Sequence, residues 1–411
     1  MRNGLRRYIN PRNRDPIPAM SLLFARDKAL DPMVDFTRAS DNASYYNAAG
    51  VLSYAAQNEP RFTHDPSTLQ SLGLLIEESR TNLLTYSEEF DNAAWTKAEC
   101  TISANAITAP GGSLTADKVV ESSATGAHLV QQIKALSSAA HTFSIFAKKG
   151  GRNWVYLRGV GAGGINIRAW FNLDAGTVGT VNTGGTGSIT SIGGGWYFCV
   201  LTIASAVASG FEYQYGIADD DNSVSYAGDG TSGIYIWGAQ LEAGSTASSY
   251  IKTTSSTATR AADNASITGS NFSDWYNQAE GAFVVDYENG LAGYIVLAAG
   301  SDTSNVIRLG TRLTGSSDEI LVVIDGGVIQ VSLSNSPSTG RNLCAFSYRE
   351  NDFALSMNGA AASTTSFGTV PTADTLAIGG TPFYGAFNGT IASIAYYPTR
   401  LSNSHLQYLS S

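Results

Sequence analysis

The chain has 411 residues, of which 43% are hydrophobic and 14% are charged, and its formal net charge is -9 at pH 7. The length exceeds one typical domain, and the hydrophobic share is enough for buried cores. The negative charge argues against a general nucleic-acid-binding protein. No apolar stretch approaches the roughly 18 residues of a membrane span. We therefore expect no nucleic-acid partner and no membrane insertion.

The first segment, residues 1–35, is basic and interrupted by prolines. Arms of this kind are normally disordered. The apolar run Ala19–Ala25 is too short for the core of a secretion signal. We interpret residues 1–35 as an extended docking arm. Its candidate docking residues are Arg2, Arg6, Arg7, Arg12 and Arg14.

Residues 36–95 form a mixed segment of short strands and loops, and its stretch Gly73–Trp95 is rich in carboxylates. A glycosidase needs two carboxyl groups about 5–9.5 Å apart across a cleft. Neighbours along a strand point to opposite faces, so clustering in sequence does not supply that geometry. We expect Glu77 to pair with Arg80 instead. The other carboxylates are expected to be solvated turn residues: Glu88, Glu89 and Asp91.

Residues 96–258 have the pattern of an all-β sandwich. The stretch Phe211–Ala218 alternates strictly. Its apolar face consists of Phe211, Tyr213, Tyr215 and Ile217. Further aromatic and β-branched runs are separated by turns rich in Gly, Asn and Ser, which is typical of short strands in a sandwich.

Residues 259–411 indicate a second all-β domain. The clearest hairpin is Glu319–Leu333, which turns at Asp325-Gly326-Gly327. A second hairpin is expected to turn at Glu350-Asn351-Asp352. Near the end of the chain, Ser402 is expected to cap a short helix that directs Leu406 and Leu409 toward the sheet.

The sequence contains one short internal repeat. Thr37–Ser44 and Thr259–Ser266 are identical except that Ser40 corresponds to Ala262. Each copy lies where a new segment begins. The repeat is interpreted as a duplicated docking or linker element, and chance similarity in an Ala- and Ser-rich chain is the alternative.

Sites for a metal or for catalysis are scarce in the sequence. The oxygen-rich loop with Asp219, Asp221 and Asp229 is a candidate structural calcium site, because carboxylates suit hard cations. It lacks the glycine pattern of known calcium loops, so a solvated loop is the alternative. The 4 histidines form no close ligand pair, and the 3 cysteines are too far apart to imply disulfides or a metal site. We expect no other cofactor.

Aromatic residues are the main candidates for a binding surface. Sugars present flat C–H faces that stack on aromatic rings, although sandwich cores also contain many aromatics. Both roles stay open for these residues. The glycan-binding candidates are Trp154, Tyr156, Trp170, Trp196 and Trp237 in the first sandwich and Tyr384 in the second.

Three stretches each resemble a segment of known proteins. Phe36–Trp95, with its "RFTHDP" and "GLLIEESRTNLL", resembles a segment of tailed-bacteriophage tail-fibre, minor tail and head-spike proteins. Gly228–Asp263 resembles the end of a carbohydrate-binding-module-like jelly roll. Phe387–Ser410 resembles the closing strand and helix of laminin-G and concanavalin-like sandwiches. The resemblance implies that Gly73–Trp95 is a linking scaffold and not a catalytic element.

The concanavalin-like superfamily includes glucanases whose catalytic strand carries an E-x-D-x-x-E pattern. The nearest stretch here is Val284–Gly290, and its Asp286 and Glu288 fall short of that pattern. We therefore expect no catalytic residues and no enzymatic activity. A glycan depolymerase with these two carboxylates is kept as an alternative.

Together these features predict a jelly roll and a concanavalin-like sandwich behind an extended N-terminal arm. The leading hypothesis is a structural phage virion protein, a fibre or spike of the tail or head that binds host surface polysaccharide. Its expected partners are other virion proteins and further copies of itself in a homotrimer. It would be made in the bacterial host cytoplasm. A purely architectural virion component without glycan affinity is the other alternative.

Overall fold

The computed structural model describes residues 16–135, 139–161, 164–204, 211–289, 295–311, 319–335, 340–380 and 387–411. The chain divides into two compact units. Unit 1 is Met1–Asp35 with Asn264–Ser411, and unit 2 is Phe36–Asp263. Residues 36–95 and the predicted jelly roll thus lie in one unit, and the second boundary follows Asp263 and not residue 258.

Antiparallel strands make up nearly all regular structure in both units, so the predicted all-β class is confirmed. The described helices are short: α1 (Phe24–Asp27), α2 (Ser270–Ser273) and α3 (Asn403–Leu409). Within the described residues, no helix combines the length and apolarity that crossing a membrane requires.

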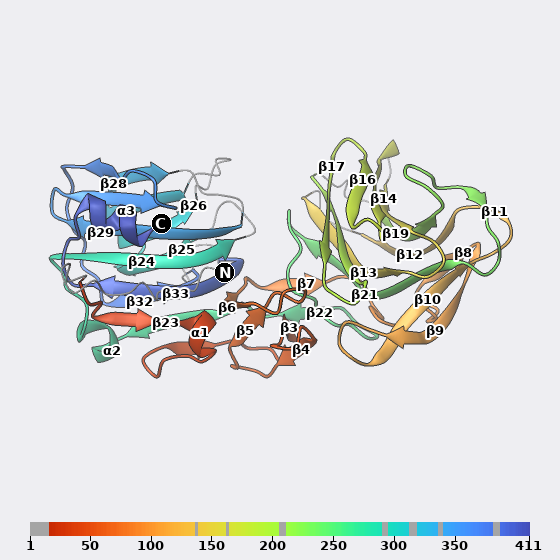
Figure 1. Cartoon of the computed structure of the whole chain (residues 1–411), viewed down its shortest axis with the longest axis horizontal. Coiled ribbons are helices and arrows are strands. Elements are labelled where there is room, and N and C mark those ends of the chain that lie inside the picture. The colour runs from red at the N-terminus through yellow and green to blue at the C-terminus, as the bar shows by residue number, and fades with distance from the viewer. Residues whose placement is uncertain are drawn as a thin grey trace. The chain divides into compact units, whose positions relative to one another are not determined.

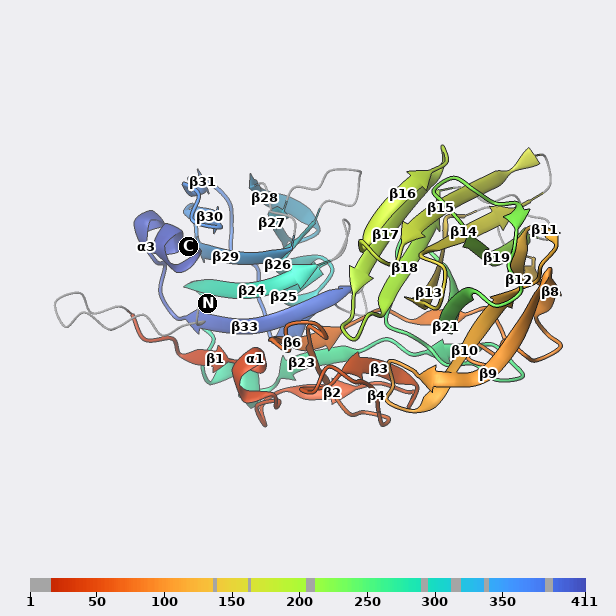
Figure 2. The same cartoon turned by 45° about the vertical axis from the view of Figure 1, so that its right-hand side comes forward.

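Unit 2 is a sandwich of two sheets, whose strands can be followed in Figure 2. One sheet has the order β17 (Gly185–Ser191), β18 (Tyr197–Ile203), β13 (His141–Lys149), β21 (Gly233–Ala243), β10 (Leu114–Glu121) and β9 (Cys100–Thr108). The other has the order β16 (Thr177–Val181), β15 (Asn166–Asn172), β14 (Trp154–Val160), β19 (Phe211–Ala218), β12 (His128–Lys134) and β8 (Thr96–Ala98).

Alternating apolar side chains of the two sheets form the core of unit 2. The predicted face of β19 lies entirely in this core: Phe211, Tyr213, Tyr215 and Ile217 are all buried. Phe143 of β13 meets the ring of Tyr213 edge-on, with the ring centroids 5.2 Å apart. The period-two pattern in the sequence therefore correctly identified the face of this strand that points into the core between the two sheets.

The segment 36–95 is built into unit 2. Its Leu52 packs on the outer side of the β17–β9 sheet, against Trp237 and Phe146. The fully buried Asn82 donates from Nδ2 to the carbonyl oxygens of Ala239 (3.0 Å) and Ile251 (2.9 Å). The segment is thus held by both apolar packing and buried hydrogen bonds.

Short strand pairs complete unit 2. They are β3 (Ala43–Tyr46) with β4 (Leu52–Ala55), β5 (Arg61–His64) with β6 (Ser71–Ile76), β7 (Arg80–Asn82) with β22 (Ala258–Arg260), and β11 (Thr125–Gly126) with β20 (Tyr226–Ala227). The short strand β2 (Asp35–Thr37) spans the first boundary between the units.

A buried charge cluster joins the start of unit 2 to its end. Arg61 Nη1 donates to Glu77 Oε2 at 2.7 Å, and Arg61 also pairs with Asp263. Arg260 lies 3.3 Å from Glu77, and Arg38 lies 3.0 Å from Asp263. The prediction that Glu77 pairs with Arg80 is wrong, because Arg80 pairs with Glu78 instead.

Both copies of the internal repeat contribute residues to this cluster. The arginines of the two copies, Arg38 and Arg260, are both fully buried in it. The copies also touch directly, since the Ala261 amide donates to Ser40 Oγ at 3.0 Å. The repeated sequence therefore supplies two arginines to one ionic network within unit 2.

Unit 1 is a second sandwich. One sheet contains β31 (Ser363–Thr365), β30 (Phe353–Met357), β29 (Arg341–Arg349), β24 (Glu280–Asn289) and β33 (Gly389–Tyr397), with β1 (Met20–Leu22) also paired to β33. The other contains β23 (Asn264–Thr268), β32 (Thr375–Ile378), β25 (Ile295–Asp302), β26 (Asn305–Thr311), β27 (Glu319–Asp325) and β28 (Val328–Asn335).

The local predictions for unit 1 are confirmed. Strands β27 and β28 are joined by Gly326 and Gly327, both with positive φ (57° and 78°), as a tight hairpin turn requires. Strands β29 and β30 form the second hairpin. Ser402 Oγ accepts a hydrogen bond from the His405 amide and caps α3, which lies against β29 (Figure 1).

The described part of the predicted arm belongs to the unit 1 sandwich. Met20 and Leu22 of β1 are buried, and β1 pairs in antiparallel register with β33. Phe24 of α1 is buried as well. Residues 16–35 therefore differ from the expected free arm, because the apolar run Ala19–Ala25 supplies an edge strand and a core residue.

Candidate functional site

The candidate site is the outer face of the β16–β8 sheet, the side turned away from the unit 2 core. The strand register places side chains on this face in rows that cross the strands. The aromatic row consists of Trp170, Tyr156, Gly216, Leu129 and Ala98. The polar row beside it consists of Arg168, Arg158, Gln214, Gln131 and Thr96.

The aromatic row forms the floor of the candidate site, by which we mean a layer of buried side chains beside the polar row. The rings of Tyr156 and Trp170 are fully buried, with their centroids 6.1 Å apart. Gly216 is needed between them and Leu129, since a Cβ at this position would lie 2.1 Å from the Tyr156 ring. Trp170 Nε1 donates to the Ser223 carbonyl oxygen at 2.7 Å, which fixes the indole. Burial favours a supporting role for these two candidate residues over direct stacking.

The polar row is connected by hydrogen bonds. Arg158 Nε donates to Asn166 Oδ1 at 2.8 Å, and its Nη1 donates to Gln214 Oε1 at 3.2 Å. Gln214 Nε2 in turn donates to Gln131 Oε1 (2.7 Å) and to Glu212 Oε2 (3.0 Å). The network crosses β15, β14, β19 and β12, and it holds the Arg158 guanidinium in one orientation.

Arg168 is placed differently from Arg158. Its guanidinium lies over the Trp170 ring, 5.9 Å from the centroid. Its Nε is buried and has no hydrogen-bond partner, and among the described residues Arg168 forms no ion pair. Burial lowers the pKa of Arg168, and the charge of Arg158 lowers it further. Burial also raises the pKa of the Tyr156 hydroxyl to about 12, so that group stays neutral at physiological pH.

Trp154 marks one end of the face. It lies on the same side of β14 as Tyr156 and Arg158 and is partly exposed. Gly179 gives it space, since a Cβ there would lie 2.7 Å from the indole. Among the described candidate aromatics on this face, Trp154 is partly exposed, whereas Tyr156 and Trp170 are buried. Trp154 and Arg158 are four positions apart along β14, which corresponds to about 13 Å.

The other candidate residues lie elsewhere. Trp196 and Trp237 are buried on the opposite sheet, in the cluster covered by Leu52, which favours a packing role. Tyr384 and the arginines of the predicted docking set fall outside the described residues: Arg2, Arg6, Arg7, Arg12 and Arg14.

The aspartates of the predicted calcium site are engaged in separate local bonds. Asp221 accepts from the amide (2.8 Å) and hydroxyl (2.9 Å) of Thr180. Asp219 accepts from Ser223 at 2.5 Å. Asp229 accepts from the amides of Thr231 and Ser232, which lower its pKa. In the described part of the chain, no group of three or more His, Cys, Asp or Glu residues could hold a metal ion.

The carboxylates considered for catalysis also serve the fold. Glu77 is buried in the charge cluster. Glu88 was expected to be solvated, but it is buried. Tyr250 Oη (3.1 Å) and Lys252 Nζ (2.7 Å) donate hydrogen bonds to its carboxylate. Glu89 and Asp91 are exposed as expected. Asp286 pairs with Arg341, which also faces the charge of Glu288.

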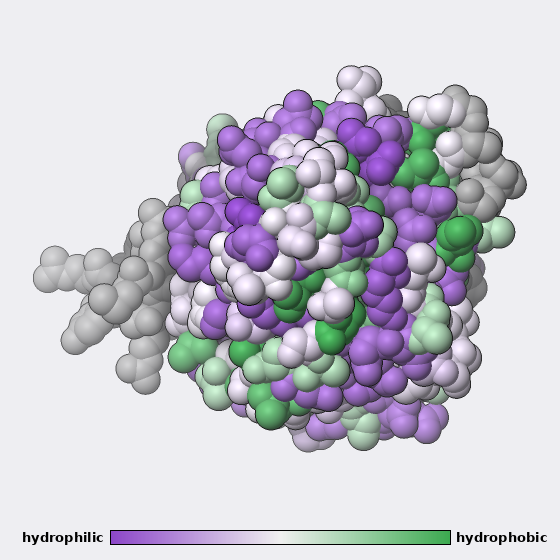
Figure 3. Space-filling model, turned by 90° about the vertical axis from the view of Figure 1, so that its right-hand side faces the viewer, coloured by the Kyte–Doolittle hydropathy of each residue, from purple (hydrophilic) through white to green (hydrophobic). Residues whose placement is uncertain are grey.

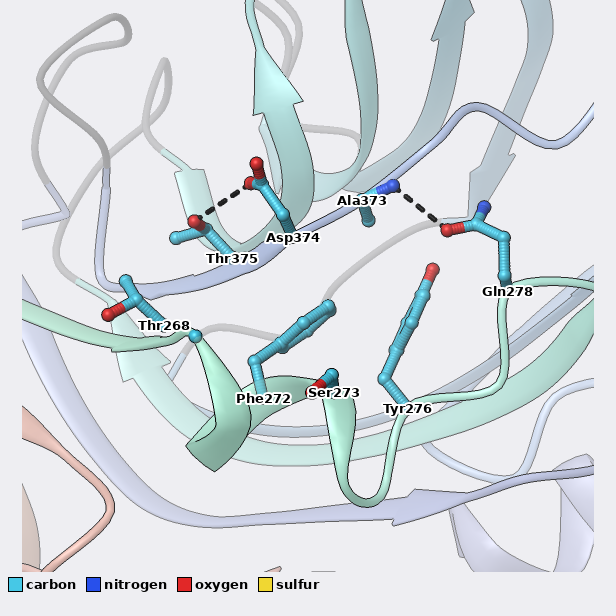
Figure 4. Close-up of a pocket in the computed structure, with 9 residues that line it drawn as sticks. Thr268, Phe272, Ser273, Tyr276, Gln278, Ala373, Asp374 and Thr375 are labelled. Carbon is cyan, nitrogen blue, oxygen red and sulfur yellow. Dashed lines mark hydrogen bonds between the residues drawn. The ribbon is translucent and has the colours of Figure 1, made fainter.

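Unit 1 carries a pocket of about 560 Å³ (Figure 4). Phe272 and Tyr276 stack at 4.5 Å on one side, and Asp374 lies on the other. Gln278 closes one end, where it donates to the Pro371 carbonyl oxygen (2.5 Å) and accepts from the Ala373 amide (3.0 Å). The Gln278 side-chain amide is thus satisfied within the protein, and the other polar side chains of the lining include Thr268, Ser273, Asp374 and Thr375. We rank it below the outer face.

The surface drawn in Figure 3 is a mosaic, with hydrophobic residues scattered among hydrophilic ones. The large exposed apolar residues of unit 2 include Leu114 on β10 and Ile133 on β12, which belong to different sheets. A scattered apolar surface favours recognition through polar groups over docking of one large hydrophobic patch.

The sequence had not singled out the polar row. Arg158, Gln214 and Gln131 lie far apart in the chain, and each lies in a strand whose apolar face draws attention to the core. The signal that could have found them is the alternation itself, since Arg158 and Gln214 both occupy outward positions beside predicted core residues.

No protein-family model and no curated protein matches the chain. Among solved structures, a receptor binding domain is similar at 10% identity and a TM-score of 0.30, over 36% of this chain and 39% of that chain. Domain 4 of a GH43 extracellular arabinanase from Geobacillus stearothermophilus, in complex with arabinotriose, is similar at 14% identity and a TM-score of 0.29. The similarity covers 36% of this chain and 73% of that chain.

Domains LG4-5 of the mouse laminin alpha1 chain are similar at 10% identity and a TM-score of 0.25, over 69% of this chain and 91% of that chain. The chain spans less than two thirds of the receptor binding domain structure. At these identities and TM-scores, none of the three assigns a family, a ligand or an activity to this chain.

Proposed function

We propose that this chain is a structural phage virion protein, a fibre or spike of the tail or head, that binds host surface glycans through the outer face of the β16–β8 sheet. The observation that carries the binding proposal is the polar row on its aromatic floor. Arg158 and Gln131 are partly exposed and form an oriented set of donors and acceptors, because the buried side chain of Gln214 links them. A sugar ring offers hydroxyl groups to such a set and C–H groups to a partly exposed ring such as Trp154.

The dimensions of the face suit an oligosaccharide. The polar row crosses five strands, which at roughly 4.8 Å per strand gives a length of about 19 Å. Its groups are held before a ligand arrives, and this lowers the conformational entropy lost on binding. Single contacts of this kind are weak. A homotrimer would present the face three times and gain from multivalency.

The virion assignment rests on the resemblance of Phe36–Trp95 to a segment of tailed-bacteriophage virion proteins. The two sandwich domains that follow are expected from the resemblance of Gly228–Asp263 to a carbohydrate-binding-module-like jelly roll and of Phe387–Ser410 to laminin-G and concanavalin-like sandwiches. In this proposal the N-terminal arginines dock the protein to other virion proteins. The chain is made in the bacterial host cytoplasm and enters the particle there. It acts without catalysis and without a cofactor.

The proposal is tested by binding the purified, labelled protein to cells of candidate hosts, with soluble host surface polysaccharide as competitor. Saturable binding that the polysaccharide displaces is the expected result. Absence of binding at micromolar protein, with the chain clustered on beads to supply multivalency, would overturn glycan recognition. It would favour the architectural alternative, in which the contacts are made to other virion proteins.

A further inference from the structure

The polar row contains two arginines that face each other directly. Arg158 of β14 and Arg168 of β15 are partners in antiparallel register. Like charges directly opposite each other in a sheet destabilise it. A neighbouring carboxylate would relieve this repulsion, but within the described residues neither arginine forms an ion pair. The pair is therefore an unneutralised positive site on a chain whose net charge is -9.

The nearby carboxylates are directed elsewhere. Glu212 lies in the next row, and its Oε2 accepts from Gln214 Nε2 at 3.0 Å. Asp221, beyond Trp154, accepts from Thr180. Glu212 is the carboxylate in the row next to the arginines, and its single negative charge does not balance the two positive charges there.

The two guanidinium groups complement each other as receptors. Arg158 is oriented by Asn166 and Gln214. Arg168 is held over Trp170, and its guanidinium has no hydrogen-bond partner among the described residues. A guanidinium presents paired N–H donors that match the two oxygens of a carboxylate or phosphate. The arrangement therefore supplies a fixed donor and a donor that still lacks an acceptor.

We propose that the glycan bound by this face is acidic, and that Arg158 and Arg168 together bind its carboxylate or phosphate group. This inference rests on the proposed function. A neutral sugar would leave the arginine pair unneutralised, whereas an acidic sugar neutralises it and gives the Arg168 Nη–H groups an acceptor. The remainder of the glycan extends along the polar row and toward Trp154.

The experiment uses the full chain and a panel of purified bacterial surface polysaccharides of three kinds: uronate-containing, phosphate-containing and neutral. Each uronate polymer is paired with its carboxyl-reduced form, and each phosphate polymer with its dephosphorylated form. Dissociation constants are measured at 50 mM and 500 mM NaCl. These matched forms identify which of the two acidic groups is recognised.

We expect at least one acidic polymer to bind at least about tenfold more tightly than its neutralised form, with affinity that falls at high salt. Arg158→Gln and Arg168→Gln should each remove most of that preference. Arg26→Gln, which removes one exposed arginine from unit 1, should leave it unchanged. Equal binding of acidic and neutralised forms, or a preference that both variants retain, would overturn the inference and leave glycan binding intact.

If the chain does not bind glycans at all, the result is different, because no polymer of the three kinds then binds at either salt concentration. The salt dependence of the native chain keeps the test informative even if a variant fails to fold. Affinity for the acidic polymer that does not change with salt would contradict a site built on two arginines.

Discussion

Arg38 and Asp263 are 225 positions apart in the chain, yet they form an ion pair of 3.0 Å with both side chains fully buried. Asp263 also accepts from Arg61 and from the Glu77 amide (2.9 Å). Arg38, near the start of unit 2, is thus joined through one carboxylate to Asp263, its last residue. This network explains part of the internal repeat, because the repeated arginines Arg38 and Arg260 both belong to it.

Asp263→Asn should lower the free energy of unfolding of unit 2 by about 3–5 kcal/mol, because it leaves buried arginines without their partner. Urea denaturation followed by tryptophan fluorescence would measure this, since of the 6 tryptophans only Trp275 lies outside unit 2. Asp41→Asn is the matched control. Asp41 is the exposed equivalent of Asp263 in the first copy, and its change should stay within about 0.5 kcal/mol. Equal effects of both changes would contradict the network.

The stability of unit 2 should fall in acid because of Glu77. Burial alone would raise the pKa of this carboxyl, but Arg260, Arg61 and the Ser249 hydrogen bonds outweigh burial and lower it from 4.5 to about 2. A carboxyl with a lowered folded-state pKa stabilises the fold above its unfolded pKa. That contribution is lost as pH falls from about 4.5 to 2.

The expected loss is on the order of 3 kcal/mol, at 1.36 kcal/mol per pKa unit. Urea denaturation at pH 6, 4, 3 and 2 measures it. Glu77→Gln should be less stable at pH 6 and should show a shallower decline toward pH 2 than the native chain. A parallel decline in both would show that other groups set the acid sensitivity.

Gly216→Val should destabilise unit 2 by about 1–3 kcal/mol, since its side chain would occupy the space of the Tyr156 ring. The displaced ring would disturb the floor under the polar row, so near-ultraviolet circular dichroism should change as well. Gly111→Ala is the control. A Cβ at Gly111 has its nearest neighbour at 3.7 Å, and this variant should unfold like the native chain. A native-like Gly216→Val spectrum and stability would contradict the placement of Tyr156.

Two truncations separate docking from folding. Removing residues 1–15 takes away the candidate docking arginines and leaves β1 and α1 intact, so the thermal unfolding of unit 1 should not change. Removing residues 1–30 also deletes Met20, Leu22 and Phe24 from the core and should cost roughly 3 kcal/mol or more. Calorimetry measures both. In the proposed function, removal of residues 1–15 alone abolishes incorporation into particles, and normal incorporation would argue against docking by these arginines.

Local features could be predicted from the sequence because they depend on neighbours in the chain. Gly326 and Gly327 define a hairpin turn, Ser402 caps α3, and the alternation in β19 identifies the face that points into the core. The pairing of Glu77 could not be predicted in the same way. Its partners Arg61 and Arg260 come from distant segments, and only the folded chain brings them to one place.

The candidate site shows the same limit. Trp154 was singled out as an aromatic residue, and it is partly exposed on the outer face. Arg158 and Arg168 were missed because their importance depends on strand register, which sets them opposite each other. Tyr156 and Trp170 could not be assigned to core or surface from sequence, since buried and ligand-stacking aromatics have the same local pattern.

The central claim is that the outer face of the β16–β8 sheet binds glycan. The most direct test compares polysaccharide affinity of the native chain, a Gln131→Ala/Arg158→Ala variant of the polar row, and an Asp374→Ala variant at the rim of the unit 1 pocket. We predict at least about tenfold weaker binding for the polar-row variant, with native stability, and unchanged binding for Asp374→Ala. Unchanged affinity in the polar-row variant, or loss only in Asp374→Ala, would contradict the account.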